Sequence, residues 1–280
     1  MIIIRESGLL KTELEKIRSK KTPLGFVPTM GALHQGHISL INSCKEKCGF
    51  AICSIFVNPT QFNNKEDLQK YPRTIEKDID MLESAGCDML FLPDNEDIYP
   101  VEYQATYFEL EDLDKKWEGE FRPGHFQGVC QVVSILIGVI QPDMLFLGEK
   151  DFQQCLVISR LAKIQNWNTE VVICPTLREE DGLAMSSRNL RIPAQDRKNA
   201  SAIFNALRCL KQEMISGKTD AVREKCEKIL TDAGLQVEYF AVTDEQLNRV
   251  NNWDGQTRLR GIVAASLGGV RLIDNMKITD

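Results

Sequence analysis

The feature that most constrains this chain is an alternation of short apolar runs with helical stretches over its first 175 residues. Five runs have the length and the β-branched and aromatic content of strands, and they cover 24–29, 50–58, 88–93, 143–148 and 170–175. Helical patterns lie between them, at about 37–48, 74–85, 126–140 and 151–165. The runs are apolar throughout, as in parallel strands that helices cover on both faces. The pattern therefore predicts an α/β fold built on a doubly wound parallel sheet with right-handed crossovers.

A second region with a different pattern follows Asp181-Gly182. Pro193 suits the first turn of a helix, and helical patterns cover about 194–215 and 219–233. The strand-like runs LQVEYFAVTD, RGIVAASLGG and VRLIDN follow them. We therefore expect a sheet domain over residues 1–180 and a smaller α+β domain over 181–280, with one large domain as the alternative. The opening MIIIRESG predicts a further strand, since it lacks the longer apolar core of a signal peptide.

The charge balance and the cysteines limit the partners and the compartment. Lys and Arg total 34 against 40 Asp and Glu, and the net charge of -6 argues against a broad nucleic-acid surface. No run reaches the roughly 18–20 apolar residues of a membrane span. The nine cysteines follow no repeating spacing, which predicts reduced, mostly buried thiols of a cytoplasmic protein. A metal pair at Cys44 and Cys48 is the weaker interpretation, because no second ligand cluster follows them.

Polar groups follow four of the five predicted strands of the first region. Thr29 leads into MGALHQGH, Asn58 into PTQF, Gly148 into EKD, and Pro175 into TLR and then MSSR. In an open parallel sheet, ligands bind beyond the carboxyl ends of the strands. We therefore expect these segments to converge on one site suited to a polyanion.

The H-x-G-H motif is the strongest candidate within that site. The chain has only three histidines, and His34 and His37 lie three residues apart at a strand–turn–helix junction. Gly36 allows close approach to a ligand, and the helix N-terminus favours negative charge. Two imidazoles there can donate to phosphate oxygens, whereas the simpler interpretation is a helix start with two exposed histidines.

Two further segments carry cations. Lys150 stands at a strand-to-helix turn, where it either holds phosphates or is a solvated charge, and Asp151 is a candidate helix cap. Ser186, Ser187 and Arg188 offer two hydroxyls and a forked cation for phosphates, although serine-rich loops are also common linkers. Their place at the domain boundary suggests a segment that closes over the site.

Neutral groups complete the candidate set. Gln61 and Gln154 suit hydroxyl or carboxylate recognition, but either could be an ordinary surface glutamine. His125 lies in a Gly- and Pro-rich loop and either lines the site or only shapes the turn. The chain has no G-x-x-x-x-G-K-[ST] loop and no G-x-G-x-x-G after the first strand, which argues against the usual P-loop and dinucleotide modes of binding.

Taken together, these segments resemble the pantothenate synthetase (pantoate–β-alanine ligase) family of the nucleotidyltransferase superfamily. The resemblance is carried by VPTMGALHQGH, SIFVNPTQF, YPRT, RPGHFQGV, QPDMLFLGEKDFQQ and REEDGLAMSSRN, over about 26–190, and by RLIDN near the end. It implies a Rossmann-like domain that joins (R)-pantoate to β-alanine with ATP, through a pantoyl adenylate, releasing AMP and diphosphate. It further implies a need for Mg²⁺ and a homodimer formed through the N-terminal domain.

The resemblance also implies roles for individual residues. His34, His37, Lys150 and Arg188 would act on the phosphates, with His37 at the position usually described as a proton donor. Gln61 and Gln154 would bind pantoate, Gln61 would also lie near β-alanine, and Asn58 would support that pocket. The implied ATP-binding residues are Met30, Gly31, Ala32, Leu33, His34, Gln35, Gly36, His37, Gly148, Glu149, Lys150, Asp151, Leu177, Met185, Ser186, Ser187 and Arg188.

One departure from the family and three alternatives stay open. An acidic run that some members carry after YPRT is interrupted here by Lys77, so Asp78 is an uncertain ligand and Mg²⁺ could be held mainly by phosphates and water. The alternatives are another adenylyl or cytidylyl transferase, a tRNA-charging enzyme, and a non-enzymatic nucleotide-binding module. Another adenylyl or cytidylyl transferase would not share SIFVNPTQF and GEKDFQQ. The net negative charge argues against a tRNA-charging enzyme. A passive binding module would not need both histidines together with Lys150 and Arg188.

Overall fold

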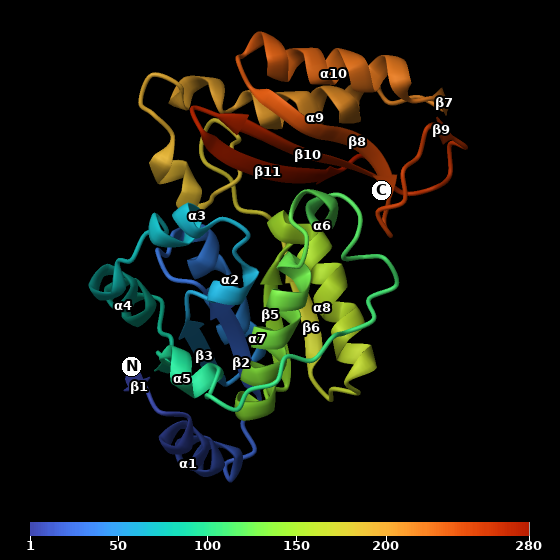
Figure 1. Ribbon diagram of the computed structural model, residues 1–280. Coiled ribbons are helices and arrows are strands. Elements are labelled where there is room, and N and C mark those ends of the chain that lie inside the picture. The colour runs from blue at the N-terminus through green and yellow to red at the C-terminus, as the bar shows by residue number, and fades with distance from the viewer. Residues whose placement is uncertain (280) are drawn as a thin grey trace. The chain divides into compact units, whose positions relative to one another are not determined.

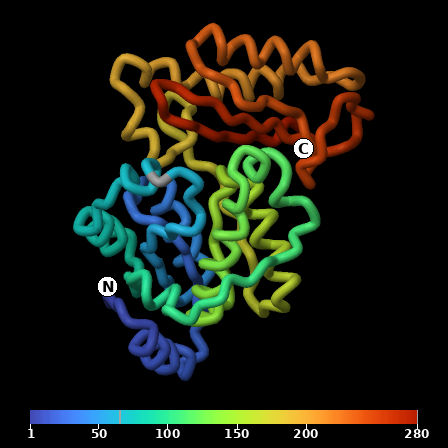
Figure 2. The backbone as a smooth tube through the Cα atoms, in the orientation of Figure 1, coloured from blue at the N-terminus to red at the C-terminus, as the bar shows by residue number. Residues whose placement is uncertain are grey.

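The computed structural model describes residues 1–279, apart from the side chain of Lys65, and the chain forms two compact units. The first unit comprises Met1–Glu149 and Gln153–Pro175, drawn mainly in blue to yellow-green in Figure 1 and Figure 2. The second comprises the described chain from Thr176 onward together with Lys150–Phe152. The sequence did not predict that this short segment groups with the second unit. The domain boundary expected near residue 180 stays a prediction.

The first unit is built on six strands that all run parallel (Figure 1). Their order across the sheet is β1-β4-β3-β2-β5-β6. The bounds are β1 Ile2–Ile4, β2 Leu24–Thr29, β3 Phe50–Ile55, β4 Met89–Phe91, β5 Met144–Gly148 and β6 Glu170–Cys174. This confirms the doubly wound parallel sheet. The strand expected over 50–58 is shorter than predicted, because the chain turns into the 3₁₀ helix η1, Pro59–Gln61.

The helices of this unit follow the strands in the alternation that the sequence predicts. The longer ones are α2 Gln35–Lys47, α4 Ile75–Ser84, α7 His125–Ile140 and α8 Phe152–Ile164, and the short ones are α3 Lys65–Gln69, α5 Asn95–Ile98, α6 Glu118–Phe121 and η2 Glu149–Asp151. Helix α1, Ser7–Arg18, was not predicted, although its buried Leu10, Leu14 and Ile17 recur at helical spacing.

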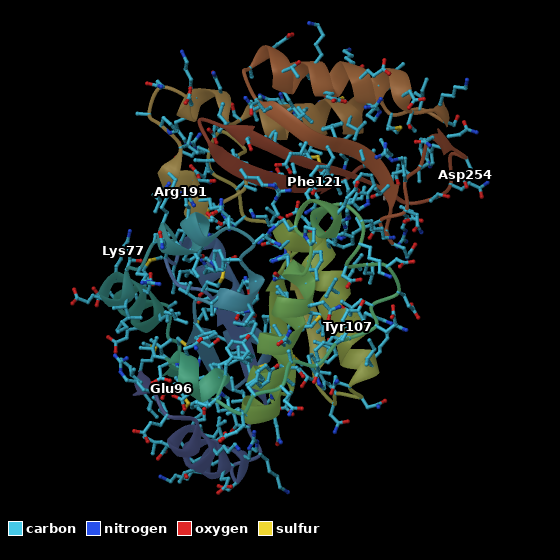
Figure 3. The ribbon with its side chains drawn as sticks, in the orientation of Figure 1. Lys77, Glu96, Tyr107, Phe121, Arg191 and Asp254 are labelled. Carbon is cyan, nitrogen blue, oxygen red and sulfur yellow. The ribbon has the colours of Figure 1, made fainter. Side chains whose placement is uncertain are left out.

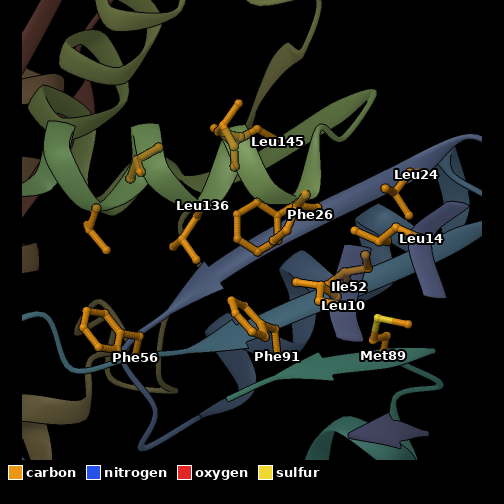
Figure 4. Packing of buried hydrophobic residues seen from close by; sticks show 14 of the residues in the cluster. Leu10, Leu14, Leu24, Phe26, Ile52, Phe56, Met89, Phe91, Leu136 and Leu145 are labelled. Atoms are coloured by element: carbon orange, nitrogen blue, oxygen red, sulfur yellow. The ribbon is translucent and has the colours of Figure 1, made fainter. Parts of the chain in front are cut away.

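Helices cover both faces of the parallel sheet because its strands are apolar on both faces. Phe26 of β2 packs in one cluster with Leu10 of α1 and Leu136 of α7, as Figure 4 shows. The next residue, Val27, packs in a second cluster with residues of α2 and α4. Neighbouring residues of a strand point to opposite faces, so β2 is buried from both sides. A truncation such as Phe26→Ala would cost about 3–5 kcal/mol of stability, since the surrounding core cannot collapse into the cavity.

The second unit is an antiparallel sheet packed on two helices, which confirms the α+β expectation. Strands β8 Gln236–Asp244, β10 Leu259–Leu267 and β11 Val270–Lys277 lie in the order β11-β10-β8. Helices α9 Ala202–Glu213 and α10 Asp220–Asp232 pack their apolar residues into the same core. The short strands β7 Gly217–Lys218 and β9 Asn252–Trp253 pair separately. A two-residue turn joins β10 to β11, and Gly268 and Gly269 supply its positive φ angles of +55° and +77°.

One helix prediction in this unit was wrong at its start. The helix expected from about residue 194 begins at Ala202. The preceding residues form a tight turn, since the carbonyl of Pro193 accepts the N–H of Asp196 at 2.8 Å and of Arg197 at 3.0 Å. A short 3₁₀ helix, η4 Arg197–Asn199, follows this turn. Pro193 therefore opens a turn and not the first turn of α9.

Candidate active site

The sheet of the first unit has a topological switch point between β2 and β5. These strands are neighbours, but the chain continues from β2 to β3 on one side and from β5 to β6 on the other. In open α/β sheets, ligands bind beyond the carboxyl ends of the strands at such a point. The Met30–His37 segment leaves β2 at this edge, and Glu149 follows β5 there.

The two histidines cap helix α2. His34 is the N-cap residue, and its Nδ1 accepts the N–H of Gly36 at 3.1 Å. In return, Nδ1 of His37 accepts the N–H of His34 at 3.3 Å, and the ring centroids lie 4.1 Å apart. The helix thus begins at Gln35, two residues earlier than the sequence suggested. Because both Nδ1 atoms accept from the backbone, we infer that each ring carries its hydrogen on Nε2 and can donate from that atom.

Asp78 of α4 holds the turn that precedes these histidines. Its carboxylate accepts the N–H of Ala32 at 2.9 Å and of Leu33 at 2.8 Å, and the hydroxyl of Thr74 at 3.0 Å. The side chain is 1% exposed. Ala32 has a φ of +49°, a conformation that costs an L-residue roughly 1–2 kcal/mol. A buried carboxylate that binds consecutive N–H groups stabilises this strained turn.

Gly31 is required by the same turn. Its φ is +81°, and a Cβ there would lie 3.0 Å from Cγ2 of Ile55 and 3.2 Å from Oδ2 of Asp78. The sequence suggested Asp78 only as an uncertain metal ligand, but the Asp78 carboxylate oxygens accept the backbone N–H groups of this turn. Lys77, which interrupts the acidic run, is exposed on the outer side of α4 (Figure 3).

A buried amide pair lies beyond the end of β3. Asn58 is 1% and Gln61 is 9% exposed, and Nδ2 of Asn58 donates to Oε1 of Gln61 at 3.0 Å. Backbone groups fix the Asn58 amide, because its Nδ2 also donates to the carbonyl of Gly128 at 3.1 Å while its Oδ1 accepts the N–H of Thr60 at 3.3 Å. The Oε1 of Gln61 is thereby an acceptor toward Asn58, and its Nε2 points to Sδ of Met30 at 3.1 Å. Gln61 therefore presents N–H donors, which suit an oxygen-bearing ligand.

Three residues that the sequence left unassigned support this pair. The Tyr99 hydroxyl donates to Oδ1 of Asn58 at 2.8 Å, and burial raises the pKa of Tyr99 to about 12, so the hydroxyl keeps its proton. A Cβ on Gly128 would lie 2.4 Å from the carbonyl oxygen of Thr60, so α7 can approach η1 only with glycine there. His125 is 6% exposed, and its Nδ1 lies 2.9 Å from the carbonyl oxygen of Gln61. Its contact is with the backbone of the site, which favours the turn-shaping interpretation.

The second glutamine of the predicted pocket, Gln154, lies half-buried on α8. Its neighbour Gln153 is 7% exposed, and its amide is tied to the carbonyls of Leu113 and Lys116, both at 2.7 Å. Gln153 therefore serves the packing of the 113–118 loop.

The cationic candidates belong to the second unit. The side chain of Lys150 is 17% exposed, and its Nζ lies 3.5 Å from Oδ1 of Asp151. Ser186 caps the 3₁₀ helix η3, Ser187–Arg191, by accepting the N–H of Arg188 at 3.3 Å. Ser187 is buried, and Arg188 is half-buried.

A small hairpin leads into that cap. The carbonyl of Leu177 accepts the N–H of Met185 at 3.0 Å, and the side chain of Leu177 is 40% exposed. Arg178 closes the hairpin by donating to the carbonyl of Gly182 at 3.0 Å, and it pairs with Asp274 of β11 through contacts of 2.6 and 3.1 Å. Burial raises the pKa of Asp274 above its usual range, and the nearby charges of Arg178 and Lys150 oppose that rise.

The structure thus brings the predicted site residues together in two groups. In the first unit, the Met30–His37 turn contacts the Asn58–Gln61 pair through Met30. Gly148 and Glu149 follow β5 in the same unit. In the second unit, the Lys150–Asp151 pair and the segment Leu177–Arg188 lie on loops that β11 holds.

The fold is of the α/β, Rossmann-like class, with a smaller antiparallel sheet in the second unit. A profile of the family Pantoate-beta-alanine ligase matches residues 2–277. Relatives named pantothenate synthetase from Bacteroides thetaiotaomicron and Porphyromonas gingivalis are each 43% identical, with 99% and 100% of both chains aligned. The chain belongs to the pantoate–β-alanine ligase family.

Solved structures agree with this assignment. The crystal structure of pantothenate synthetase from Thermus thermophilus has a TM-score of 0.92 at 37% identity and covers 100% of both chains. That of pantoate–β-alanine ligase from Francisella tularensis, complexed with β-γ ATP and β-alanine, has a TM-score of 0.82 at 38% identity and covers 99% of this chain and 98% of that one.

Proposed function

We propose that this chain catalyses the ATP-dependent condensation of (R)-pantoate with β-alanine to pantothenate, releasing AMP and diphosphate. The observation that carries the proposal is the match to the ligase family over residues 2–277. The Francisella tularensis relative, which was solved with β-γ ATP and β-alanine, supports the same substrates here. A match along the whole chain favours this ligase over the other H-x-G-H transferases, a tRNA-charging enzyme and a passive nucleotide-binding module.

The reaction proceeds through a pantoyl adenylate. A carboxylate oxygen of pantoate attacks the α-phosphorus of ATP, and the bond to the diphosphate leaving group breaks. The amine of β-alanine then attacks the acyl carbon and AMP leaves with the oxygen that bridged the two groups. Neither step needs a protein nucleophile, so the enzyme must align the reactants and neutralise charge on the phosphates.

The histidine-capped helix supplies part of that charge neutralisation. With Nδ1 of both rings engaged by backbone N–H groups, His34 and His37 offer Nε2–H donors at the N-terminus of α2. The helix dipole favours anions at the same place. His37 and His34 therefore hold phosphate oxygens and stabilise the charge that develops on them, with Met30–Gly36 as the backbone of the nucleotide loop.

The second unit supplies the fixed cations. Lys150 and Arg188 neutralise the triphosphate, Ser186 and Ser187 donate to it, and the backbone of Leu177 contacts the adenine. Glu149, Asp151 and Met185 complete the nucleotide site with Gly148. The segment Met185–Arg188 closes over the nucleotide once the nucleotide binds.

The neutral amide side chains recognise the organic substrates. Gln61 and Gln154 bind pantoate, and Gln61 also lies near β-alanine. The donor orientation of the Gln61 amide supports this role, because pantoate offers hydroxyl and carboxylate oxygens.

Mg²⁺ would be supplied together with ATP. Among residues 1–279, no group of three or more His, Cys, Asp or Glu side chains is placed to hold a metal ion. Asp78 directs its oxygens to the N–H groups of Ala32 and Leu33. Mg²⁺ is usually held by substrate phosphates, water and one or two carboxylates, so the ion would arrive as the ATP complex and would supply charge neutralisation on the phosphates.

The assembly and compartment follow the family. We propose a homodimer that forms through the first unit and works in the cytoplasm. Within the described chain, no helix has both the length and the apolar character needed to cross a bilayer. Sedimentation equilibrium of the purified protein tests the dimer, which predicts twice the chain mass, whereas a single-chain mass at micromolar concentration refutes it.

Exchange of labelled diphosphate into ATP tests the proposed function. The account predicts exchange that needs pantoate and proceeds without β-alanine, because the adenylate forms before β-alanine acts. Absence of pantoate-dependent exchange in folded protein refutes it. Stoichiometric AMP formation with both substrates removes the passive binding module.

A further inference from the structure

The Lys150–Phe152 segment is tied to the antiparallel sheet of the second unit. Nδ2 of Asn275, on β11, donates to the main-chain carbonyl of Lys150 at 2.9 Å. Asn275 is 5% exposed, although a position near the end of a strand is commonly open to water. The bond spans 125 residues of sequence, so it fixes the lysine to a strand far along the chain.

A buried arginine sets the orientation of the Asn275 amide. Arg260 of β10 is 1% exposed and donates through Nη1 to Oδ1 of Asn275. Since a guanidinium can only donate, Oδ1 must face Arg260 and the NH₂ group must face the carbonyl of Lys150. The same guanidinium lies 3.6 Å from the centroid of the Phe152 ring and 3.4 Å from a carboxylate oxygen of Glu245. Both ends of the 150–152 segment are therefore fixed, one by a hydrogen bond and the other by a cation–π contact.

Asp274, the residue before Asn275, holds the hairpin that leads into the second cationic segment, Met185–Arg188. Asp274 pairs with Arg178, which also donates to the carbonyl of Asn275 at 3.3 Å. Neighbouring residues of a strand point to opposite faces of the sheet. Two consecutive residues of β11 thus hold the hairpin before Met185 on one face and the Lys150 segment on the other.

We propose that Asn275 is a positioning residue for Lys150, and that Asp274 and Asn275 together set the places of the two cationic segments. The proposal rests on the proposed function, in which Lys150 neutralises the ATP phosphates. Asn275 acts on the reaction only through the main chain of Lys150. Its loss should therefore matter only while the lysine ammonium is present.

A double-mutant cycle tests this dependence. Asn275→Ala should lower kcat for pantoate-dependent exchange by about 10-fold to 100-fold, because a displaced cation stabilises the transition state less well. In the Lys150→Ala background, the same substitution should lower kcat by less than about 2-fold. Equal fold-losses in both backgrounds overturn the proposal, since they would mean that Asn275 acts by a route other than Lys150.

Two further variants distinguish a loss of kcat through lost positioning from a loss of kcat through lost stability. Asn275→Asp keeps an acceptor for Arg260 but replaces the donor to Lys150 with a carboxylate oxygen. It should be as impaired as Asn275→Ala while its unfolding temperature stays nearer the wild type. Asn248→Ala removes an amide that bonds Asp244 in an exposed turn of the same unit, and it should leave kcat unchanged. An active Asn275→Asp variant refutes the need for the donor.

Hydrogen exchange separates this inference from the proposed function. In Asn275→Ala, amides of residues 149–153 should exchange faster, while those of the α7 helix keep their wild-type protection. This readout does not depend on catalysis. If wild-type protein lacks exchange activity, the proposed function fails, and the anchoring of the segment is still judged by its amide protection. Unchanged protection over 149–153 overturns the anchoring.

Discussion

The two groups of site residues are held in place by opposite hydrogen-bond chemistry. In the first unit, the Asp78 carboxylate binds the backbone N–H groups of Ala32 and Leu33 and so fixes the turn before the histidines. In the second, the Asn275 amide donates to the carbonyl of Lys150. A turn that leads into a helix N-terminus has backbone N–H groups that need an acceptor. A loop whose backbone carbonyl points into the protein interior needs a donor. Each group therefore has its own buried anchor, and each can be disabled separately.

The largest expected effects come from the groups that we propose contact the ATP phosphates. Lys150→Ala and His37→Ala should each lower kcat by about 100-fold or more, because each removes charge stabilisation from the transition state. Steady-state kinetics with saturating ATP measure the loss, and circular dichroism checks that the fold is intact. Near-wild-type turnover in either variant removes that residue from the proposed mechanism.

The anchor of the first unit should have the next largest effect. Asp78→Asn places an NH₂ group against backbone N–H donors and should reduce kcat by about 10-fold and the free energy of unfolding by about 2–4 kcal/mol. Urea unfolding and kinetics on the same preparation give both values. Asp80→Asn, two residues away on the exposed side of α4, is the matched control and should change neither. Wild-type values for Asp78→Asn would show that the turn does not depend on this carboxylate.

A smaller effect is expected at the hydroxyl behind the amide pair. Tyr99→Phe removes one of the donors to Asn58 but leaves the bond from Thr60, so the Gln61 amide is only loosened. The loss of one hydrogen bond corresponds to a rise of about 3-fold to 10-fold in the KM for pantoate, with little change in kcat. Tyr103→Phe is the control, since its hydroxyl bonds Gln131 and its ring packs 5.1 Å from Tyr99. Equal shifts in both variants would contradict the assigned role.

The smallest effect concerns stability at high pH. Burial raises the pKa of Cys87 to about 11, and it also raises the pKa values of Cys44 and Cys53. Between the unfolded thiol pKa of about 8.5 and these raised values, the folded state binds more protons than the unfolded state. The contribution of these buried thiols to the free energy of unfolding is therefore fully present below about pH 8.5. It falls as the pH rises, by up to about 1.4 kcal/mol per pH unit for each thiol. Cys87→Ala should flatten this fall, and an unchanged slope would contradict the assignment.

The sequence predicted the parts of the fold that depend on local pattern. The strand over 24–29 and the helix over 126–140 are rich in apolar residues, and the structure places β2 and α7 there. The start of α9 was misjudged, because the turn after Pro193 depends on hydrogen bonds that no local pattern reveals. The shorter β3 reflects the competing turn at Asn58.

The site residues divide in the same way, into those that a local pattern predicts and those that depend on tertiary packing. The histidine pair and the amide Gln61 were visible as motifs after strands, since the topology of a parallel sheet carries them to one edge. Asp78, Tyr99 and Asn275 were not assigned these roles, because each acts on a segment at least 40 residues away in the chain. Such long-range hydrogen bonds depend on tertiary packing, and no spacing within the sequence encodes them.

The central claim is that the carboxylate of pantoate attacks the α-phosphorus of ATP, and an isotope experiment tests it most directly. Pantoate labelled with ¹⁸O in both carboxylate oxygens is incubated with ATP, β-alanine and the enzyme, and the products are examined by mass spectrometry. The account predicts one ¹⁸O in AMP and one in the amide carbonyl of pantothenate. Unlabelled AMP, or ¹⁸O in inorganic phosphate released together with ADP, would contradict it.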